Sequence, residues 1–393
     1  MERKYKVLFA STGINFITAI IYVWSVISKT LVNQLNWTSK EASLPYTTLT
    51  ITFVIAMIIF GKIVDSKGPT FPAILGSILI GLGVLFSGLA LDPTIMIITM
   101  GVLVGAGSGI INVATTATAV KWFPPEKKGM VTGIVVAGVG LSSAFYSPLS
   151  NYLINTVGIA KTFIYLGIFV LVLALPLSLL IKRPPKDFVL KGEEIDKEEN
   201  SQKDKDWKYI IKDRYFYKMW FMLGLSSSAG LMIIGHISNI AKIQVSWEAG
   251  FVLVILISIF NSLGRFLGGF LSDKIGRLRL ARLLFIMQGM NMFLFTIYGN
   301  VWLLALGVAV AGLCYGGGFS IFPAMASDAY GSKNFGMNYG MLFTSWGLGG
   351  VIGPMTAAAI LDAFGSYNYA YIVAGILLLI SIVISFTIKN EAN

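Results

Sequence analysis

The stretch GKIVDSKG, residues 61–68, decides how the chain is organised, because a related stretch, GFLSDKIG, recurs at residues 269–276. Each copy follows a long apolar segment and places Gly, Asp and Gly at the same spacing. A second pair of stretches, residues 127–148 and 334–354, repeats at nearly the same offset, with matched glycines and a proline at the end. Two landmarks that share one offset indicate that the chain consists of two similar halves.

The composition predicts an integral membrane protein. Of the 393 residues 55% are hydrophobic and only 12% are charged, about half the ~25% that is usual in soluble domains. Most of the apolar segments are close to the ~20 residues that cross a ~30 Å hydrocarbon core. Spanning segments must satisfy their own backbone hydrogen bonds, so they are predicted as helices. The segments are 7–28, 44–63, 71–90, 94–119, 129–152, 161–181, 214–236, 249–271, 280–298, 301–325, 336–360 and 368–388.

The repeat and the segments together predict an all-α membrane protein with twelve transmembrane helices in two pseudo-symmetric six-helix bundles. We expect an N-terminal bundle at residues 1–182 and a C-terminal bundle at 214–393. Residues 183–213 between them are rich in charges of both signs, which is typical of a solvated linker. A short interfacial helix is predicted at residues 207–211 within this linker. Paired halves with a binding site between them are a transporter architecture.

The basic residues predict the orientation of the chain. The net charge is +11, which in a soluble protein would suggest nucleic acid, but here most Lys and Arg lie in alternate loops. This is the positive-inside bias, so both termini are predicted in the cytoplasm and no nucleic-acid partner is expected. The loops expected outside contain only Lys29, Lys40, Lys161 and Lys242.

Arg265 is the residue that the apolar segments do not explain. It precedes Asp273 by eight residues, which places it about 12 Å below the membrane surface on a helix. All nineteen Asp and Glu fall in loops or at helix ends, so no buried carboxylate is expected to pair with it. A packing arginine is one interpretation, and an arginine that binds an anionic ligand is the favoured one, because a guanidinium fork fits a carboxylate. Asn261, one turn earlier, can hydrogen-bond Arg265 and a ligand together, or join neighbouring helices.

The two copies of G-x-x-x-D-x-x-G, within twelve predicted helices, resemble the major facilitator superfamily over essentially the whole chain. KWFPPEKKGMVTGI at residues 121–134 and the stretch from YGGGF to SWGLGG at residues 315–350 are similar to the oxalate/formate antiporter family. That family is related to the monocarboxylate transporters. In both families an arginine of the eighth helix binds the substrate carboxylate, and the resemblance gives this role to Arg265.

The resemblance also suggests further substrate-binding residues. Four of them match cavity positions of the family: Tyr146, Tyr315, Phe319 and Trp346. Tyr22 and Trp24 in the first segment and Asn112 in the fourth are weaker candidates. Packing in the core is the alternative for each of these residues.

Two positions differ from the families that the chain resembles. Oxalate carriers have a second cation, a lysine, about where this chain has Gly349. Monocarboxylate transporters have an aspartate one turn before the arginine, where this chain has Asn261. One cation argues against oxalate, and the missing aspartate removes a proton-binding Asp–Arg pair.

Other polar residues have predicted roles outside the binding site. In the superfamily the repeated loop motif latches the two halves together on the cytoplasmic side, which assigns gating roles to Asp65, Lys62, Asp273 and Arg277. Ordinary charge at helix ends is the alternative. His236, the one histidine, could carry a coupling proton or act as a hydrogen-bonded interface residue.

These observations favour a secondary transporter of a small organic monocarboxylate such as lactate, pyruvate or formate, working by alternating access as proton symport or anion exchange. The alternatives are an oxalate/formate-type dicarboxylate antiporter and a non-transporting carboxylate receptor. One His, one Cys and no buried acid do not supply an enzyme's catalytic groups, and no cofactor or metal site is expected. The expected partners are the carboxylate, a proton for symport, and the lipid bilayer of a prokaryotic cytoplasmic membrane, with the protein working as a monomer.

The predicted topology can be tested with single cysteines. A membrane-impermeant thiol reagent added outside should label cysteines placed at Lys40 and Lys242, and should leave those at Lys127 and Lys203 unlabelled until the membrane is opened. The reverse labelling pattern would overturn the orientation.

Overall fold

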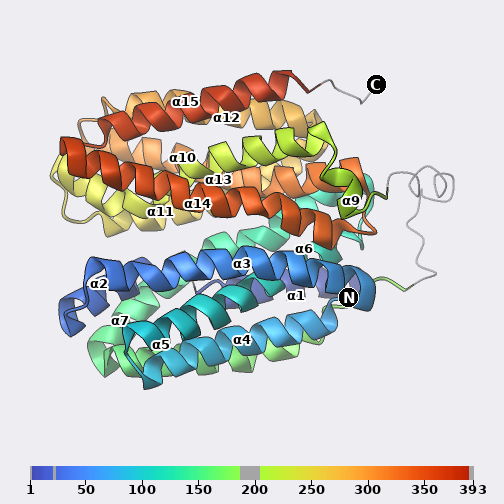
Figure 1. Ribbon diagram of the computed structural model, residues 1–393, viewed down its shortest axis with the longest axis horizontal. Helices are drawn as coiled ribbons and strands as arrows, with labels where there is room; N and C mark the ends of the chain where they lie inside the picture. Colours follow the sequence, from blue (N-terminus) through green and yellow to red (C-terminus); the bar gives the residue numbers. More distant parts are fainter. Residues whose placement is uncertain (1, 21–23, 186–203, 389–393) are drawn as a thin grey trace. The chain divides into compact units, whose positions relative to one another are not determined.

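The computed structural model describes residues 2–20, 24–185 and 204–388, and in these ranges the chain forms helices joined by short connections, with no strand (Figure 1). The helices are α1 (Arg3–Thr18), α2 (Trp24–Leu35), α3 (Ser39–Lys67), α4 (Thr70–Leu89), α5 (Pro93–Met96), the π-helix η2 (Ile97–Val104), α6 (Gly105–Val120), the 3-10 helix η3 (Pro125–Lys127), α7 (Lys128–Ser178), α9 (Trp207–Ile210), α10 (Arg214–Val245), α11 (Phe251–Ile275), α12 (Arg277–Phe295), α13 (Val301–Tyr330), α14 (Phe335–Phe364) and α15 (Asn368–Phe386).

All twelve predicted segments fall on these helices. Ten helices in the described part of the chain are long and apolar enough to cross a membrane. One of them, α7, contains two predicted segments that meet at Gly158, where φ is +82° and the chain bends. The first predicted segment is divided between α1 and α2. The short helix expected in the linker is also present, as α9.

The first segment differs from the prediction of one continuous helix. Helix α1 ends at Thr18 and α2 begins at Trp24, and residues 21–23 lie outside the described part. The Tyr146 hydroxyl, from α7, donates a hydrogen bond to the Ile17 carbonyl oxygen at 2.5 Å. A continuous α-helix would offer that oxygen to its own next turn, so the tyrosine provides a partner for the broken end.

The fourth segment also departs from a regular α-helix. Residues 97–104 form a π-helix between α5 and α6. The Thr52 hydroxyl of α3 donates to the Gly101 carbonyl oxygen at 2.6 Å, while the Gly105 N–H bonds Val102. A neighbouring side chain therefore takes an oxygen of the helix ladder, which is a recognised cause of local helix distortion.

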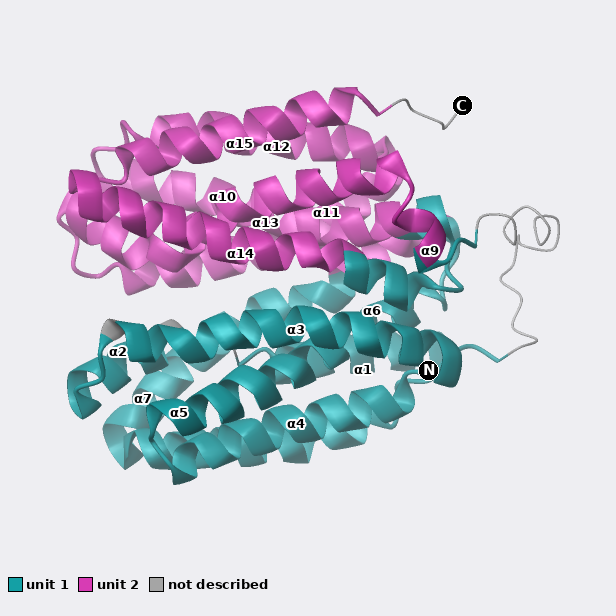
Figure 2. Cartoon of the chain, in the orientation of Figure 1, with its two compact units in different colours: residues 1–125, 134–207, 327–341 teal, residues 126–133, 208–326, 342–393 magenta. Residues whose placement is uncertain are grey.

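The chain forms two compact units (Figure 2). Unit 1 contains residues 1–125, 134–207 and 327–341, and unit 2 contains residues 126–133, 208–326 and 342–393. The first turns of α7 thus belong to unit 2, and those of α14 belong to unit 1. Because these units follow contacts in space, the bundle boundaries drawn from the sequence stay a prediction.

Glycines set the helix spacing inside each unit in the same way. In unit 1 a Cβ on Gly109 of α6 would collide with the Phe53 carbonyl oxygen of α3. In unit 2 a Cβ on Gly316 of α13 would collide with the Asn261 carbonyl oxygen of α11. The two contacts correspond in the sequence repeat. Small residues at helix crossings are typical of membrane proteins, because close backbones gain packing energy.

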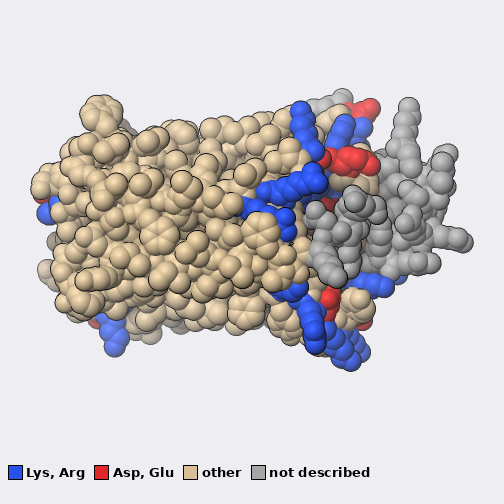
Figure 3. All heavy atoms as spheres, turned by 90° about the horizontal axis from the view of Figure 1, so that it is seen from above, with Lys and Arg blue, Asp and Glu red and all other residues tan. Residues whose placement is uncertain are grey.

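The surface has the character expected of a protein in a bilayer. Ile51, Ile55 and Ile59 lie one turn apart on α3, and all three are exposed. Figure 3 shows the Lys and Arg side chains gathered mainly toward one end of the face that it displays, whereas most of that face carries no charge. Apolar helix faces with charge kept to the ends fit a lipid environment.

The glycine contacts predict which substitutions destabilise the protein. Gly109→Ala and Gly316→Ala should each lower the apparent Tm in detergent, because overpacking a tight contact costs about 1–3 kcal/mol. Gly289→Ala is the matched control, because its new Cβ would lie 3.6 Å from Leu378, an ordinary contact. Equal Tm values for all three variants would contradict this account of the crossings.

Candidate functional site

Arg265 lies in the middle of α11 and is completely buried, with 0% of its surface exposed. In the described ranges it is the only charged residue in the buried class; every Asp and Glu there is at least partly exposed. A charge held away from water is costly, so the contacts of this side chain decide its role.

Two side chains orient the guanidinium of Arg265. Its Nε donates a hydrogen bond to Asn261 Oδ1 at 2.9 Å, one turn earlier on the same helix. Its Cζ lies 4.4 Å from the centroid of the Phe319 ring on α13, a distance at which the ring face attracts a cation. The neighbouring Ser320 hydroxyl donates to the Arg265 carbonyl oxygen. The hydrogen bond expected between Asn261 and Arg265 is therefore present.

Aromatic side chains continue from Phe319. Tyr315 is one turn before it on α13, with ring centroids 4.9 Å apart. The Trp346 indole Nε1 of α14 donates to the Tyr315 hydroxyl at 3.0 Å, and its ring meets Phe319 edge-on at 6.2 Å. Three predicted site residues thus form one cluster beside Arg265, all within unit 2.

Phe343 belongs to the same cluster, although the sequence analysis did not select it. Its ring lies 5.5 Å from Phe319 and 6.2 Å from Trp346. It precedes Trp346 by three residues on α14, which places both on one face of the helix. That spacing was the signal available in the sequence.

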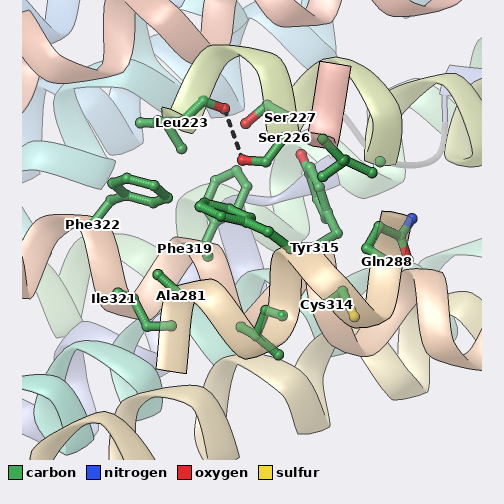
Figure 4. A pocket seen from close by; sticks show the side chains of 15 residues that line it. Leu223, Ser226, Ser227, Ala281, Gln288, Cys314, Tyr315, Phe319, Ile321 and Phe322 are labelled. Atoms are coloured by element: carbon green, nitrogen blue, oxygen red, sulfur yellow. Dashed lines mark hydrogen bonds between the residues drawn. The ribbon is translucent and has the colours of Figure 1, made fainter. Parts of the chain in front are cut away.

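A small cavity lies behind this cluster in unit 2. Figure 4 shows Tyr315 and Phe319 projecting from α13 toward Ser226 and Ser227 of α10. The cavity volume is about 20 Å³ and its lining does not include Arg265. A space of this size holds about one water molecule. No charged side chain lines this cavity, so the arginine cluster is the stronger candidate for an anion-binding site.

The predicted site residues of unit 1 have structural partners. Trp24 is buried and its Nε1 donates to the Ala42 carbonyl oxygen at 3.0 Å. Asn112 accepts a hydrogen bond at 2.8 Å from the Tyr339 hydroxyl at the start of α14. Tyr146 bonds the end of α1, as described above, and Tyr22 lies outside the described residues. Their roles in substrate binding stay predictions.

Asp65, at the end of α3, binds the beginning of α14. Its carboxylate accepts hydrogen bonds from the N–H groups of Gly336 at 3.1 Å and Met337 at 2.9 Å. Lys121 Nζ lies 3.0 Å from the same carboxylate. A carboxylate is favourable at a helix N-terminus, where unpaired N–H groups and the helix dipole meet it.

Asp273, at the end of α11, binds the beginning of α7 in the same way. It accepts hydrogen bonds from the N–H groups of Gly129 at 3.0 Å and Met130 at 2.7 Å. Arg277, one turn later, pairs with it. The two matched stretches of sequence therefore meet the two copies of the loop motif, each within one unit.

Lys62 is placed differently from the other predicted gating residues. It is exposed, and the cation that reaches Asp65 is Lys121, which the sequence analysis did not select. Lys121 follows α6, which packs along α3. The cation that pairs with Asp65 is therefore set by the packing of α6 on α3, and the loop motif alone does not predict it.

Both ring nitrogens of His236, in α10, lie within hydrogen-bond distance of a partner. Nε2 lies 3.1 Å from the Pro354 carbonyl oxygen, and Nδ1 lies 3.1 Å from the Tyr367 hydroxyl. The Asn239 amide donates to that hydroxyl at 2.9 Å. A neutral imidazole with its proton on Nε2 satisfies the whole network, because Tyr367 can then donate to Nδ1. This geometry favours an anchoring role, and the proton role stays a prediction.

No group of three or more His, Cys, Asp and Glu in the described ranges is placed to hold a metal ion.

Comparison with known proteins agrees with this architecture. The Major Facilitator Superfamily family model matches residues 8–287 and 227–392. The uncharacterised MFS-type transporter YhjX of Escherichia coli K12 is 28% identical over 88% of this chain and 86% of its own. The oxalate:formate antiporter of Oxalobacter formigenes is 28% identical over 80% and 74%. Monocarboxylate transporter 13 of Rattus norvegicus is 25% identical over 81% and 73%.

A solved structure shows the same fold. The Escherichia coli fucose:proton symporter FucP matches with a TM-score of 0.74, covering 99% of this chain and all of that chain at 13% identity. The twelve-helix fold predicted from the sequence is confirmed. The chain belongs to the Major Facilitator Superfamily and is a multi-pass membrane protein of a transporter family, not an enzyme.

The His236 network predicts the result of two substitutions. His236→Gln should leave the pH profile of transport unchanged, because a glutamine amide can still donate to the Pro354 carbonyl oxygen. His236→Ala should lower the Tm, because the lost hydrogen bonds are worth about 1–3 kcal/mol when their partners stay buried. A flattened pH profile in the glutamine variant would instead assign the coupling proton to His236.

Proposed function

We propose that this transporter moves a small organic monocarboxylate, such as lactate, pyruvate or formate, by alternating access. The observation that carries the proposal is the buried guanidinium of Arg265, held by Asn261 and Phe319 inside an apolar helix bundle. Ionisable residues at this depth in a membrane are expensive, and they characteristically mark substrate or ion pathways.

The contacts of Arg265 suggest how the anion is bound. Asn261 engages Nε and Phe319 covers one face of the guanidinium. In the proposed complex the carboxylate is met by the terminal Nη groups. Two parallel N–H···O bonds would fix both the position and the orientation of the anion. The aromatic cluster formed by Tyr315, Phe343 and Trp346 would supply an apolar wall for its organic part.

The structure supports a monocarboxylate over oxalate at Gly349. Oxalate carriers of the family that the chain resembles have their second cation at about this position. A Cβ at this position would lie 2.6 Å from the Gly224 carbonyl oxygen of α10, so close helix packing leaves no room for a longer side chain without movement. Among the residues that the structure describes, Arg265 is the single buried cation, which matches a single negative charge. The oxalate/formate-type antiporter remains the second candidate, supported by the similarity to the Oxalobacter formigenes protein.

The cycle that we propose has three parts. The carboxylate binds at Arg265, the two halves rearrange around it, and the helix-end contacts of Asp65 and Asp273 form in one state and break in the other. Proton symport and anion exchange both fit this scheme. We place the protein in a prokaryotic cytoplasmic membrane, with both termini in the cytoplasm, because the basic residues concentrate in the loops on that side.

The direct test is uptake of a carboxylate panel into proteoliposomes, with and without a pH gradient. Arg265→Lys keeps the charge but loses the planar fork, so uptake should fall sharply. Arg265→Gln should abolish uptake, because removing one partner of a desolvated charged pair costs about 2–5 kcal/mol of binding energy.

The matched control is Arg279→Gln, which removes an exposed arginine at the start of α12. It should transport at close to the wild-type rate. Wild-type uptake by the Arg265→Gln variant would refute the proposed site. Wild-type protein that prefers oxalate to monocarboxylates would favour the second candidate.

A further inference from the structure

Two basic side chains from different helices of unit 2 meet the end of α15. Lys218 of α10 donates a hydrogen bond from Nζ to the Thr387 carbonyl oxygen at 2.9 Å. Arg282 of α12 donates one from Nη2 to the Ser385 carbonyl oxygen at 2.7 Å. Both α10 and α12 pack along α15. The two positive charges therefore lie at one junction of three helices.

Capping of α15 uses only part of the hydrogen-bonding capacity of these two side chains. Cations are favourable at a helix C-terminus, where the last carbonyl oxygens lack partners within the helix. An ammonium group has three N–H donors and a guanidinium group has five, and α15 accepts one hydrogen bond from each. Arg282 Nε has no hydrogen-bond partner among the described residues. The junction thus keeps donors for a further acceptor.

The two cations also lack a counter-charge from the protein. In the described ranges neither Lys218 nor Arg282 forms an ion pair with a carboxylate. Asp273, an acid at the end of α11, is paired with Arg277 instead. Lys218 and Arg282 are both only partly exposed, so their charges are screened less than those of fully exposed residues. This combination favours an anion as the further acceptor.

The surface one helical turn deeper than the junction is apolar. Phe221 follows Lys218 by three residues on α10, and its side chain is exposed. Ile286 follows Arg282 by four residues on α12, and it is exposed as well. The exposed ring of Phe386, on α15, lies with its centroid 4.4 Å from Arg282 Cζ. Residues three or four apart share a helix face, so the cations lie directly above side chains that suit acyl chains.

We propose that Lys218 and Arg282 bind the phosphate of an anionic phospholipid, whose acyl chains lie along Phe221 and Ile286. Basic pockets between membrane helices bind anionic headgroups through the same attraction. A zwitterionic headgroup carries its own cation beside the phosphate, so the site prefers phosphatidylglycerol to phosphatidylcholine. The bound lipid joins the ends of α10, α12 and α15 and stabilises unit 2. Neither cation belongs to the Arg265 site, so the proposal does not depend on the transported ligand.

A lipid titration of the purified full chain in detergent micelles, without any carboxylate, tests the site. Phosphatidylglycerol should raise the Tm of the wild type, as mass action requires of a ligand that binds the folded state, and phosphatidylcholine should raise it clearly less. Lys218→Gln and Arg282→Gln should each weaken the apparent affinity for phosphatidylglycerol about fivefold, as expected for one basic side chain near an anionic lipid. Arg282→Lys keeps the charge, so it should weaken the affinity less than Arg282→Gln.

Lys242→Gln is the matched control, because Lys242 is an exposed cation in the last turn of the same helix, α10. Its affinity for phosphatidylglycerol should equal that of the wild type. Equal rises in Tm with the two lipids would overturn the proposal, and so would wild-type affinity in both glutamine variants. Inorganic phosphate alone should leave the Tm unchanged. A rise as large as that with phosphatidylglycerol at the same concentration would identify a site for a free anion and refute the lipid site.

Discussion

The organisation of this protein depends on one costly interaction, the burial of a guanidinium among membrane helices. Arg265 is the only buried charge in the described ranges. Asn261 and Phe319 give it one hydrogen bond and one ring face. A charge in that setting is retained when it serves a function, because an apolar side chain of similar size would stabilise a membrane helix better.

The same helix links this charge to the helix-end contacts. Asp273 lies eight residues after Arg265 on α11, a separation of about 12 Å along a rigid rod. Asp273 holds the first turn of α7, and a Cβ on Gly133 of α7 would collide with the Arg265 carbonyl oxygen. A ligand bound at Arg265, as proposed, would therefore act on the same pair of helices that Asp273 joins, which would give a physical route from that ligand to the predicted latch.

The sequence predicted those parts of the structure that follow from periodicity and repetition. The twelve apolar segments follow from composition, and the hydrogen bond that Arg265 donates to Asn261, one turn away, follows from helix periodicity. The break between α1 and α2 was not predicted, and the side chain that bonds the end of α1, Tyr146, is more than a hundred residues away. Lys121 pairs with Asp65 where Lys62 was predicted, and Phe343 joins the aromatic cluster. Both findings depend on which helices lie side by side, and the sequence alone does not give that.

The central claim is that the cost of burying Arg265 is offset by an anion, and a thermal-shift comparison tests it most directly. The Tm of the wild type and of Arg265→Gln would be measured with and without saturating monocarboxylate. Without the anion, the variant should be at least as stable as wild type, because a buried charge has been removed. With the anion, only the wild type should gain stability, as mass action requires of a ligand bound through Arg265. An equal gain in both proteins would contradict the account.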